Sequence, residues 1–290
     1  MQLLIKLLAF IPLPLAYGIA NLWGSLAALL NTRIYRITLE NLELCLPELS
    51  LEEREKLARR SLQETAKVIF ETAKAWTFPR QWIMSAFIRE NRRELLDKAL
   101  NSEKATIALV PHLGNWEMFG AWLSAQKPIL AMYLPPENEV AHALIVKSRE
   151  HTGLSVAPAN RKGVMQVLKA AKNGDFIGIL PDQEPDREGG EFAPFFRQPA
   201  LTMSLVHRLI QKTDCQVIMG FGKRIPGGFE AVLREPDPDI YSSEEAISLE
   251  ALNRSIEACV REAPEQYQWE YKRFKQHPSG KKKVHYRKHK

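Results

Sequence analysis

The stretch 105–133, ATIALVPHLGNWEMFGAWLSAQKPILAMY, decides the fold of this chain. It opens with the apolar run 105–110, which predicts a buried strand, continues with a helical pattern at 115–126 and closes with a second strand at 128–133. The same alternation continues, with helix, strand, helix and strand predicted at 137–152, 154–157, 162–173 and 176–180. Strands that alternate with helices predict an α/β fold with a central, mostly parallel sheet flanked by helices.

Helical patterns dominate the chain before this stretch, and mixed elements follow it. Residues 50–76 begin with Ser50 as a helix cap, and Pro79 lies just beyond the end of their pattern. After the alternating region we expect a helix, two paired strands and a final helix at 202–212, 217–222, 229–233 and 244–262.

The 290 residues are 45% hydrophobic and 26% charged, which excludes a disordered or collagen-like chain. The formal charge of +6 suggests a nucleic-acid partner at first, but nine basic residues lie within 271–290, which holds no acid. Without that segment the chain has 31 basic and 34 acidic side chains, a net charge of −3. A mildly acidic body with a basic C-terminal segment indicates attachment to an anionic surface, and we expect no nucleic-acid partner.

The three cysteines, Cys45, Cys215 and Cys259, are odd in number and far apart, with no CxxC pair. They predict neither a disulfide framework nor a zinc site, and a reducing compartment is the simplest interpretation. We expect each to be a small buried or half-buried apolar residue.

The N-terminal stretch 3–30 is almost entirely apolar, with Lys6 as its single charge. About 20 apolar residues can span a bilayer, so a secretory signal, a transmembrane helix and a helix lying in the interface are all candidates. A signal peptide is disfavoured because no basic cluster precedes the run and no small-residue cleavage site follows it. Pro12 and Pro14 divide the run in two, which favours a monotopic or re-entrant anchor. A helix packed on the protein's own core is the remaining alternative.

Basic residues follow the apolar run at once, as Arg33 and Arg36. Positive charge beside a membrane segment marks its cytoplasmic side and is attracted to anionic headgroups. We therefore expect a membrane anchor at 1–30, a folded body at 31–278 and a basic tail at 279–290, the tail being a solvated attachment arm.

His112 and Glu117 stand at the end of the first buried strand, in VPHLGNWEMFG. Five residues apart in one helix, they would point about 140° away from each other. They can meet if His112 lies on the strand-to-helix turn and Glu117 in the first turns of the helix, which Pro111 and Gly114 allow. Glu117 could then hold one imidazole nitrogen while the other faces substrate, so that His112 acts as a general base. A structural histidine is the alternative, since H-x-x-x-x-E alone is a weak motif.

The segment HLGNWE (112–117) belongs to an array of motifs that resembles one protein family. It is preceded by NLELCLPELS (41–50) and followed by GVMQVLKAAKNGDFIGILPDQ (163–183), FAPFFRQPALT (192–202) and APEQYQWEYKRFKQHP (263–278). From about Asn41 to Pro278 the chain resembles the lipid A biosynthesis acyltransferases, the lauroyl and myristoyl enzymes of Gram-negative bacteria. The resemblance implies the α/β fold and the His-x4-Asp/Glu dyad of the wider lysophospholipid acyltransferase group, with 31–278 as the acyltransferase domain.

The resemblance also implies roles for individual residues. His112 matches the catalytic base of the family and Glu117 its orienting acid, while Arg149 could neutralise a phosphate or steady an oxyanion. A surface position on an amphipathic helix is the alternative for Arg149. Asp182 ends a buried strand, at the edge where α/β sheets bind ligands. The predicted substrate-binding residues are Arg149, Asp182, Asn115, Trp116, Arg161 and Lys162.

One departure from the family pattern is Arg197, which stands where the family usually has Gly after two phenylalanines. Those phenylalanines, Phe195 and Phe196, could line an acyl groove together with Trp116, with core packing as the alternative.

The activity implied by the resemblance is transfer of a fatty acyl chain from acyl carrier protein to a hydroxyl of a Kdo-bearing lipid A precursor. The enzyme would need no cofactor or metal beyond the acyl donor, and would work at the cytoplasmic face of the bacterial inner membrane. One alternative is an acyltransferase for a lysophospholipid or another glycolipid. The other is a metal-dependent hydrolase whose candidate ligands are His112, Glu117, His142, His151 and Asp182.

Overall fold

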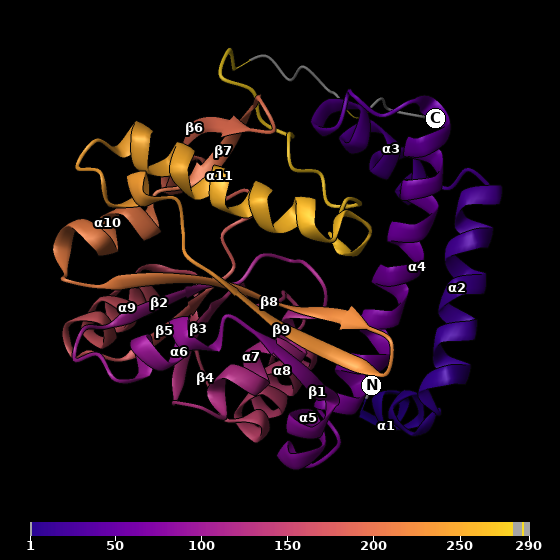
Figure 1. The fold of residues 1–290 in the computed structure, drawn as a ribbon, viewed down its shortest axis with the longest axis horizontal. Coiled ribbons are helices and arrows are strands. Elements are labelled where there is room, and N and C mark those ends of the chain that lie inside the picture. Colours follow the sequence, from indigo (N-terminus) through magenta and orange to yellow (C-terminus); the bar gives the residue numbers. More distant parts are fainter. Residues whose placement is uncertain (1, 281–285, 287–290) are drawn as a thin grey trace. The chain divides into compact units, whose positions relative to one another are not determined.

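The computed structural model describes residues 2–280 and 286 (Figure 1). The chain forms two compact units, each built from three separate stretches. Unit 1 consists of Met1–Leu15, Val68–Leu180 and Leu209–Glu235, and unit 2 of Ala16–Lys67, Pro181–Arg208 and Pro236–Lys290.

A seven-stranded sheet forms the centre of unit 1, in the order β1-β9-β8-β2-β5-β3-β4. Its strands are β1 (Phe87–Asn91), β2 (Thr106–Leu109), β3 (Ile129–Tyr133), β4 (Leu154–Pro158), β5 (Phe176–Ile179), β8 (Gln216–Ile225) and β9 (Gly228–Arg234). The strands from β8 to β4 are parallel, whereas β9 runs antiparallel to β8 and parallel to β1. Strand β2 is wholly buried and lies between β8 and β5, so its carboxyl end opens in the middle of the sheet.

The helices of this region alternate with the strands of the sheet in the order of the chain. They are α5 (Arg80–Ala86), α6 (Arg93–Leu100), α7 (Trp116–Ser124), α8 (Glu139–Thr152), α9 (Arg161–Lys172) and α10 (Leu205–Lys212). Helices α6 and α7 share one buried cluster with the sheet, which includes Leu96, Trp122 and Ile218. An asparagine side chain caps each of α7, α8 and α9 by accepting a bond from the backbone N–H three residues on.

The α/β prediction with a mostly parallel sheet flanked by helices is confirmed, and the expected elements from 105 to 180 all form. Three strands were not expected. Strand β1 lies in the region where helices were predicted to dominate, and the hairpin of β6 (Gly190–Phe195) and β7 (Gln198–Met203) precedes α10. Strand β1 lies at the sheet edge and buries only its first residue, so its sequence lacks the apolar signal of a buried strand.

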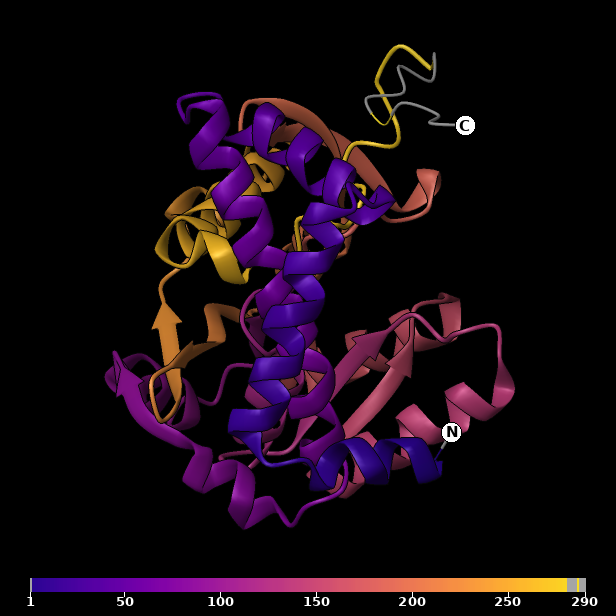
Figure 2. The same cartoon turned by 90° about the vertical axis from the view of Figure 1, so that its right-hand side faces the viewer.

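The N-terminal run forms α1 (Gln2–Phe10) and α2 (Leu13–Leu29), which meet at a break bent by 109° (Figure 2). Neither helix alone is long and apolar enough to cross a membrane, and only the bent pair together meets that requirement. Helix α1 exposes Leu3, Leu4, Leu7 and Phe10, and α2 exposes further large apolar side chains.

Unit 2 joins helices from both ends of the chain to the β6–β7 hairpin. It contains α3 (Arg33–Cys45), most of α4 (Leu51–Ala75), α11 (Glu245–Glu262) and the short helices η1 (Arg187–Gly189), η2 (Pro238–Tyr241) and η3 (Pro264–Gln266). Asn253 of α11 donates to Pro194 O and to Thr202 Oγ1, both at 2.9 Å, and so fixes the helix on the hairpin. Phe195 and Phe196 are buried in this unit, in agreement with the alternative that they pack in the core rather than line an acyl groove. All three cysteines are buried, as expected.

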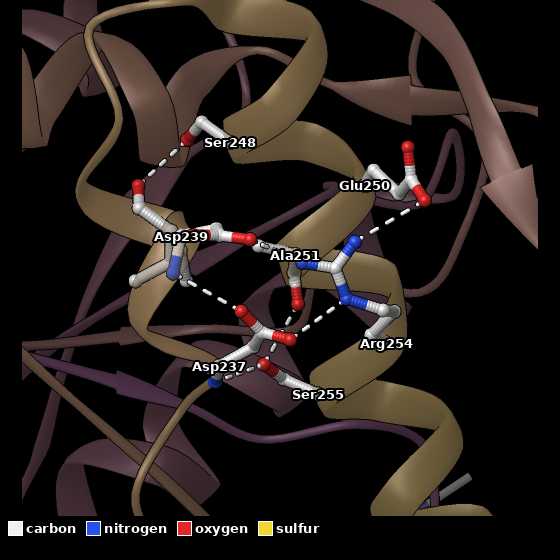
Figure 3. Close-up of polar contacts among 8 residues, drawn as sticks. Asp237, Asp239, Ser248, Glu250, Ala251, Arg254 and Ser255 are labelled. Atoms are coloured by element: carbon white, nitrogen blue, oxygen red, sulfur yellow. Dashed lines mark hydrogen bonds and ion pairs between the residues drawn. The ribbon is translucent and has the colours of Figure 1, made fainter.

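A charged cluster ties η2 to α11 (Figure 3). Arg254 bonds Asp237 at 2.7 Å and Asp239 at 2.9 Å, and lies 3.2 Å from Glu250. Hydrogen bonding from Arg254 is the main reason why the pKa of Asp237 is lowered, and burial opposes it.

Most of the predicted basic tail lies outside the described residues, but Tyr286 does not. It is 5% exposed, its hydroxyl donates to Asn41 Oδ1 at 2.8 Å, and it accepts from Phe274 N–H at 3.0 Å. At Tyr286 the structure therefore differs from the expected solvated arm, because the phenol finds hydrogen-bond partners inside unit 2.

Candidate active site

The turn after β2 is fixed by the neighbouring strands. Val110 N–H donates to Ile179 O at 2.9 Å, which keeps the chain beside β5. Gly114 has φ of +63° and forms a β-bridge with Gly222. A Cβ at Gly114 would lie 2.0 Å from Gly222 O, so only glycine fits at this position of the turn.

Asn115 begins α7 and is completely buried. Its backbone N–H donates to Gly222 O at 2.9 Å, its Oδ1 accepts from Met118 N–H at 3.0 Å, and its Nδ2 donates to Glu71 Oε2 at 2.9 Å. Through these bonds Asn115, which was predicted to bind substrate, stabilises the turn before α7.

Glu117, in the first turn of α7, is 9% exposed and is held from two other elements. Arg149, in the last turn of α8, donates from Nε to Oε2 at 3.3 Å and from Nη2 to Oε1. Trp76, just after α4, donates its indole N–H to Oε2 at 3.3 Å. The predicted residues Glu117 and Arg149 thus form a two-point ion pair, which is the strong form of an arginine–carboxylate contact.

Tyr133 supports this pair from the end of β3. The guanidinium carbon of Arg149 lies 5.6 Å from the Tyr133 ring centroid, a cation–π contact, and the Tyr133 hydroxyl lies 3.2 Å from His142 Nε2. Burial raises the pKa of Tyr133, and the charge of Arg149 acts in the opposite direction.

An apolar cavity lies beside the ion pair, between α7, α8 and the sheet. It is partly open to solvent and has a volume of about 40 Å³, with Glu117, Arg149 and Trp116 among its lining residues. The other walls are apolar or glycine: Ala108, Val110, Gly120, Leu123, Ile129, Ala131, Met132, Leu154, Gly178 and Leu180. A cavity with one charged wall and apolar remaining walls suits a hydrocarbon chain with a polar end group.

His112 is half-buried on the turn, and its ring centroid lies 4.9 Å from the Trp116 indole, edge to face. Arg161 and Lys162 are exposed in the first turn of α9, after the edge strand β4. They follow β4, which lies three strand spacings, or roughly 14 Å, from β2.

Asp182 lies in unit 2 and is 2% exposed. It accepts a hydrogen bond from the Tyr267 hydroxyl, and burial and the Asp182 charge together raise the pKa of Tyr267 well above its usual range. The APEQYQW segment thus supplies the polar partner of the PDQ aspartate.

Sequence reasoning missed Trp76 and Tyr133, which carry no motif and lie far along the chain from Glu117. Among residues 2–280 and 286, no group of three or more His, Cys, Asp or Glu could hold a metal ion. His142, one residue of the hydrolase alternative, contacts Tyr133, and His151 Nε2 lies 3.4 Å from Phe78 O.

Comparison with known proteins shows the family of this chain. The family model for bacterial lipid A biosynthesis acyltransferases matches residues 2–276. The chain is 26% identical to the lipid A biosynthesis palmitoleoyltransferase of Escherichia coli K12, over 95% of this chain and 90% of the relative. It is also 26% identical to the lauroyltransferase of that organism, over 93% and 88%, and to its myristoyltransferase, over 89% and 80%. Because the family model covers nearly the whole chain, this protein belongs to the bacterial lipid A biosynthesis acyltransferase family.

Proposed function

We propose that this protein transfers a fatty acyl chain from acyl carrier protein to a hydroxyl of a lipid A precursor of the Kdo-lipid IVA type, in lipopolysaccharide biosynthesis. The observation that carries the proposal is the Glu117–Arg149 ion pair beside an apolar cavity, five residues after His112. Family membership supports the reaction class, and the donor and acceptor are our inference.

In this mechanism His112 is the general base. It takes the proton of the acceptor hydroxyl as the oxygen attacks the thioester carbonyl, and returns a proton to the leaving thiolate of the carrier protein. Backbone N–H groups at the start of α7 stabilise the oxyanion, where the helix dipole adds positive potential. Glu117 orients His112 and stabilises the imidazolium, and Arg149 fixes Glu117 in place.

The cavity would receive the acyl chain of the donor and widen around it, because its walls are apolar except at the Glu117–Arg149 end. Arg161 and Lys162 would bind phosphate groups of the acceptor. Asp182 stays a predicted substrate-binding residue. No metal or cofactor takes part in this scheme.

We also propose that the protein works at the cytoplasmic face of the bacterial inner membrane. The exposed leucines of α1, the apolar face of α2 and Arg33 and Arg36 after it support an anchor in an anionic membrane.

The test is in vitro transfer from a panel of acyl-carrier-protein donors to the Kdo-lipid A precursor, read by product mass. We expect the acylated precursor, and a loss of about 10²- to 10⁴-fold in kcat for folded His112→Ala. Undiminished transfer by that variant would reject the mechanism. Acylation of a lysophospholipid instead would favour the related acyltransferase, and loss of activity with a chelator would favour the hydrolase.

A further inference from the structure

Glu71 and Arg224 form a buried polar cluster that contacts Asn115 in the turn before α7. The proposed mechanism assigns no role to this cluster. Glu71, in the C-terminal part of α4, has no exposed surface. Arg224, on β8, donates from Nε to Oε1 at 2.5 Å and from Nη2 to Oε2 at 2.6 Å. This two-point pairing offsets the hydration that both charges lose on burial.

Glu71 also decides which way the Asn115 amide faces. Because Nδ2 of Asn115 donates to Glu71 Oε2, Oδ1 is left to accept from Met118 N–H at the start of α7. In the opposite orientation the amide oxygen would face a carboxylate and the NH2 group would face an N–H, so both contacts would be lost. The carboxylate therefore selects the capping orientation of the amide.

Strand β8 holds the same turn at a second point. Gly222, two residues before Arg224, accepts from the Asn115 backbone N–H at 2.9 Å. The strand thus fixes the backbone of the turn directly and its side chain through Arg224 and Glu71.

We propose that Glu71 and Arg224 are positioning residues of the acyl-transfer site. They orient Asn115, which sets the start of α7 and with it the places of His112 and Glu117. The inference rests on the proposed function, but the state of the turn can be measured without it.

The experiment exchanges the amide and the carboxylate between positions 71 and 115. Asp caps a helix about as well as Asn, so if residue 115 acted only as a helix cap, Asn115→Asp would lose neither Met118 protection nor kcat. In the proposed network it places two carboxylates in contact, and Glu71→Gln removes the carboxylate that orients the Asn115 amide. The double variant Glu71→Gln/Asn115→Asp restores one carboxylate, one amide and the cap. Hydrogen exchange at the Met118 amide, kcat and KM for the acyl donor are measured on each.

We expect both single variants to lose Met118 protection and about 10²-fold in kcat with little change in KM. The double variant should regain both properties in large part, because the amide at position 71 donates to the carboxylate at position 115 and can still accept one bond from Arg224. Where a single variant fails to fold, Arg224→Lys replaces it, since lysine keeps the charge but cannot make both bonds. As a control for general destabilisation, Ile177→Val, at a fully buried strand position, should leave kcat and Met118 protection unchanged.

Retained protection and kcat in Asn115→Asp would overturn the inference. So would a double variant that regains protection but not kcat, because Asn115 would then act on substrate itself. If the parent protein transfers no acyl group, the proposed function fails, and the protection pattern alone decides the role of Glu71 and Arg224: recovery in the double variant supports it, and no change among the variants rejects it.

Discussion

The carboxylate of Glu117 lies beside an apolar cavity, where burial costs an ionised group its hydration. Arg149 and Trp76 compensate with three donated hydrogen bonds, from the end of α8 and the end of α4. Removing one partner of such a pair leaves a buried charge uncompensated, which costs more than the pair itself contributes. Arg149 thus has a role even if it never touches substrate.

Replacing Arg149 with lysine tests this geometry at the residue scale. Lysine keeps the positive charge but cannot bond both carboxylate oxygens, so Glu117 loses its fixed place. We expect Arg149→Lys to fold and to lose on the order of 10²-fold in kcat for acyl transfer. The matched control is Arg93→Lys, because Arg93 also donates two hydrogen bonds to carboxylate oxygens, those of Glu90 and Asp97, but on the surface of α6. Equal kcat values for both variants would contradict the prediction.

At the scale of elements, α7 both carries the site and forms one wall of the cavity. Its Gly120 lines the cavity, and a Cβ there would lie 3.4 Å from the Leu154 side chain, an ordinary contact. A methyl group can therefore be added without a clash, at the expense of cavity space.

Gly120→Ala should shift the donor preference toward shorter acyl chains. Each methylene excluded from the cavity is worth roughly 0.8 kcal/mol, so competing donors should change in rank by several-fold per methylene. Gly18→Ala is the control, because Gly18 is also inside a helix and its Cβ would meet nothing within 4 Å. Both variants gain helix propensity, and an equal chain-length profile for the two would count against the cavity as the acyl site.

The β6–β7 hairpin has a strained turn at Phe196 and Arg197. Phe196 and Arg197 form its two-residue turn with φ of +46° and +63°, the left-handed region that favours glycine. Phe196 N–H donates to Glu257 Oε1 at 2.6 Å, which holds the turn.

Arg197→Gly should stabilise the protein by about 1 kcal/mol, because a non-glycine residue pays roughly that much in the left-handed region. Arg197→Ala removes the same side chain but keeps the strain, and should give no gain. Thermal unfolding of the two variants checks this, and equal midpoints would contradict it.

At the scale of the whole molecule, the Arg254 cluster makes stability depend on pH. Asp237 has a lowered pKa in the folded state, so its ionised form contributes stability above the unfolded value of about 3.9. That contribution is lost as the pH falls through the lower, folded pKa.

Arg254→Met should accordingly lower the free energy of unfolding at neutral pH, and should lower it by a smaller amount in acid. Denaturant unfolding of parent and variant is compared from about pH 7 to below pH 4, where Asp237 becomes protonated in the unfolded chain. The difference in free energy of unfolding should stay constant above about pH 5 and shrink below it. A difference that is the same at every pH would reject the assignment.

The basic tail combines charge with the buried Tyr286. Changing every Lys and Arg of 281–290 to Gln should weaken binding to anionic vesicles, because each cation near the surface contributes about 1 kcal/mol, and should leave the thermal midpoint unchanged. Truncation after Pro278 removes the Tyr286 contacts as well, so it should also lower the midpoint. Vesicle sedimentation and melting curves separate the two effects, and equal midpoints for both variants would show that Tyr286 adds no stability.

Much of the fold could be predicted because its signals are local. Apolar runs at strand length and helical spacing between them depend on neighbours in sequence, so the segment from 105 to 180 predicted strands β2, β3, β4 and β5, and HLGNWE indicated the turn after β2. Strand β1 escaped because an exposed edge strand has no apolar run, and the β6–β7 turn because Phe196 and Arg197 are not residues that favour left-handed backbone.

The sequence by itself therefore determined the α/β class, the resemblance to lipid A acyltransferases and His112 with Glu117 as the candidate dyad. Only the tertiary structure decided that Glu117 pairs with Arg149 and Trp76. It also decided that Glu71 accepts a hydrogen bond from Asn115 and pairs with Arg224. Those partners come from α8, α4 and β8, and the order of the strands and the packing of helices on them bring such distant residues together. Spacing along a chain carries no record of that order.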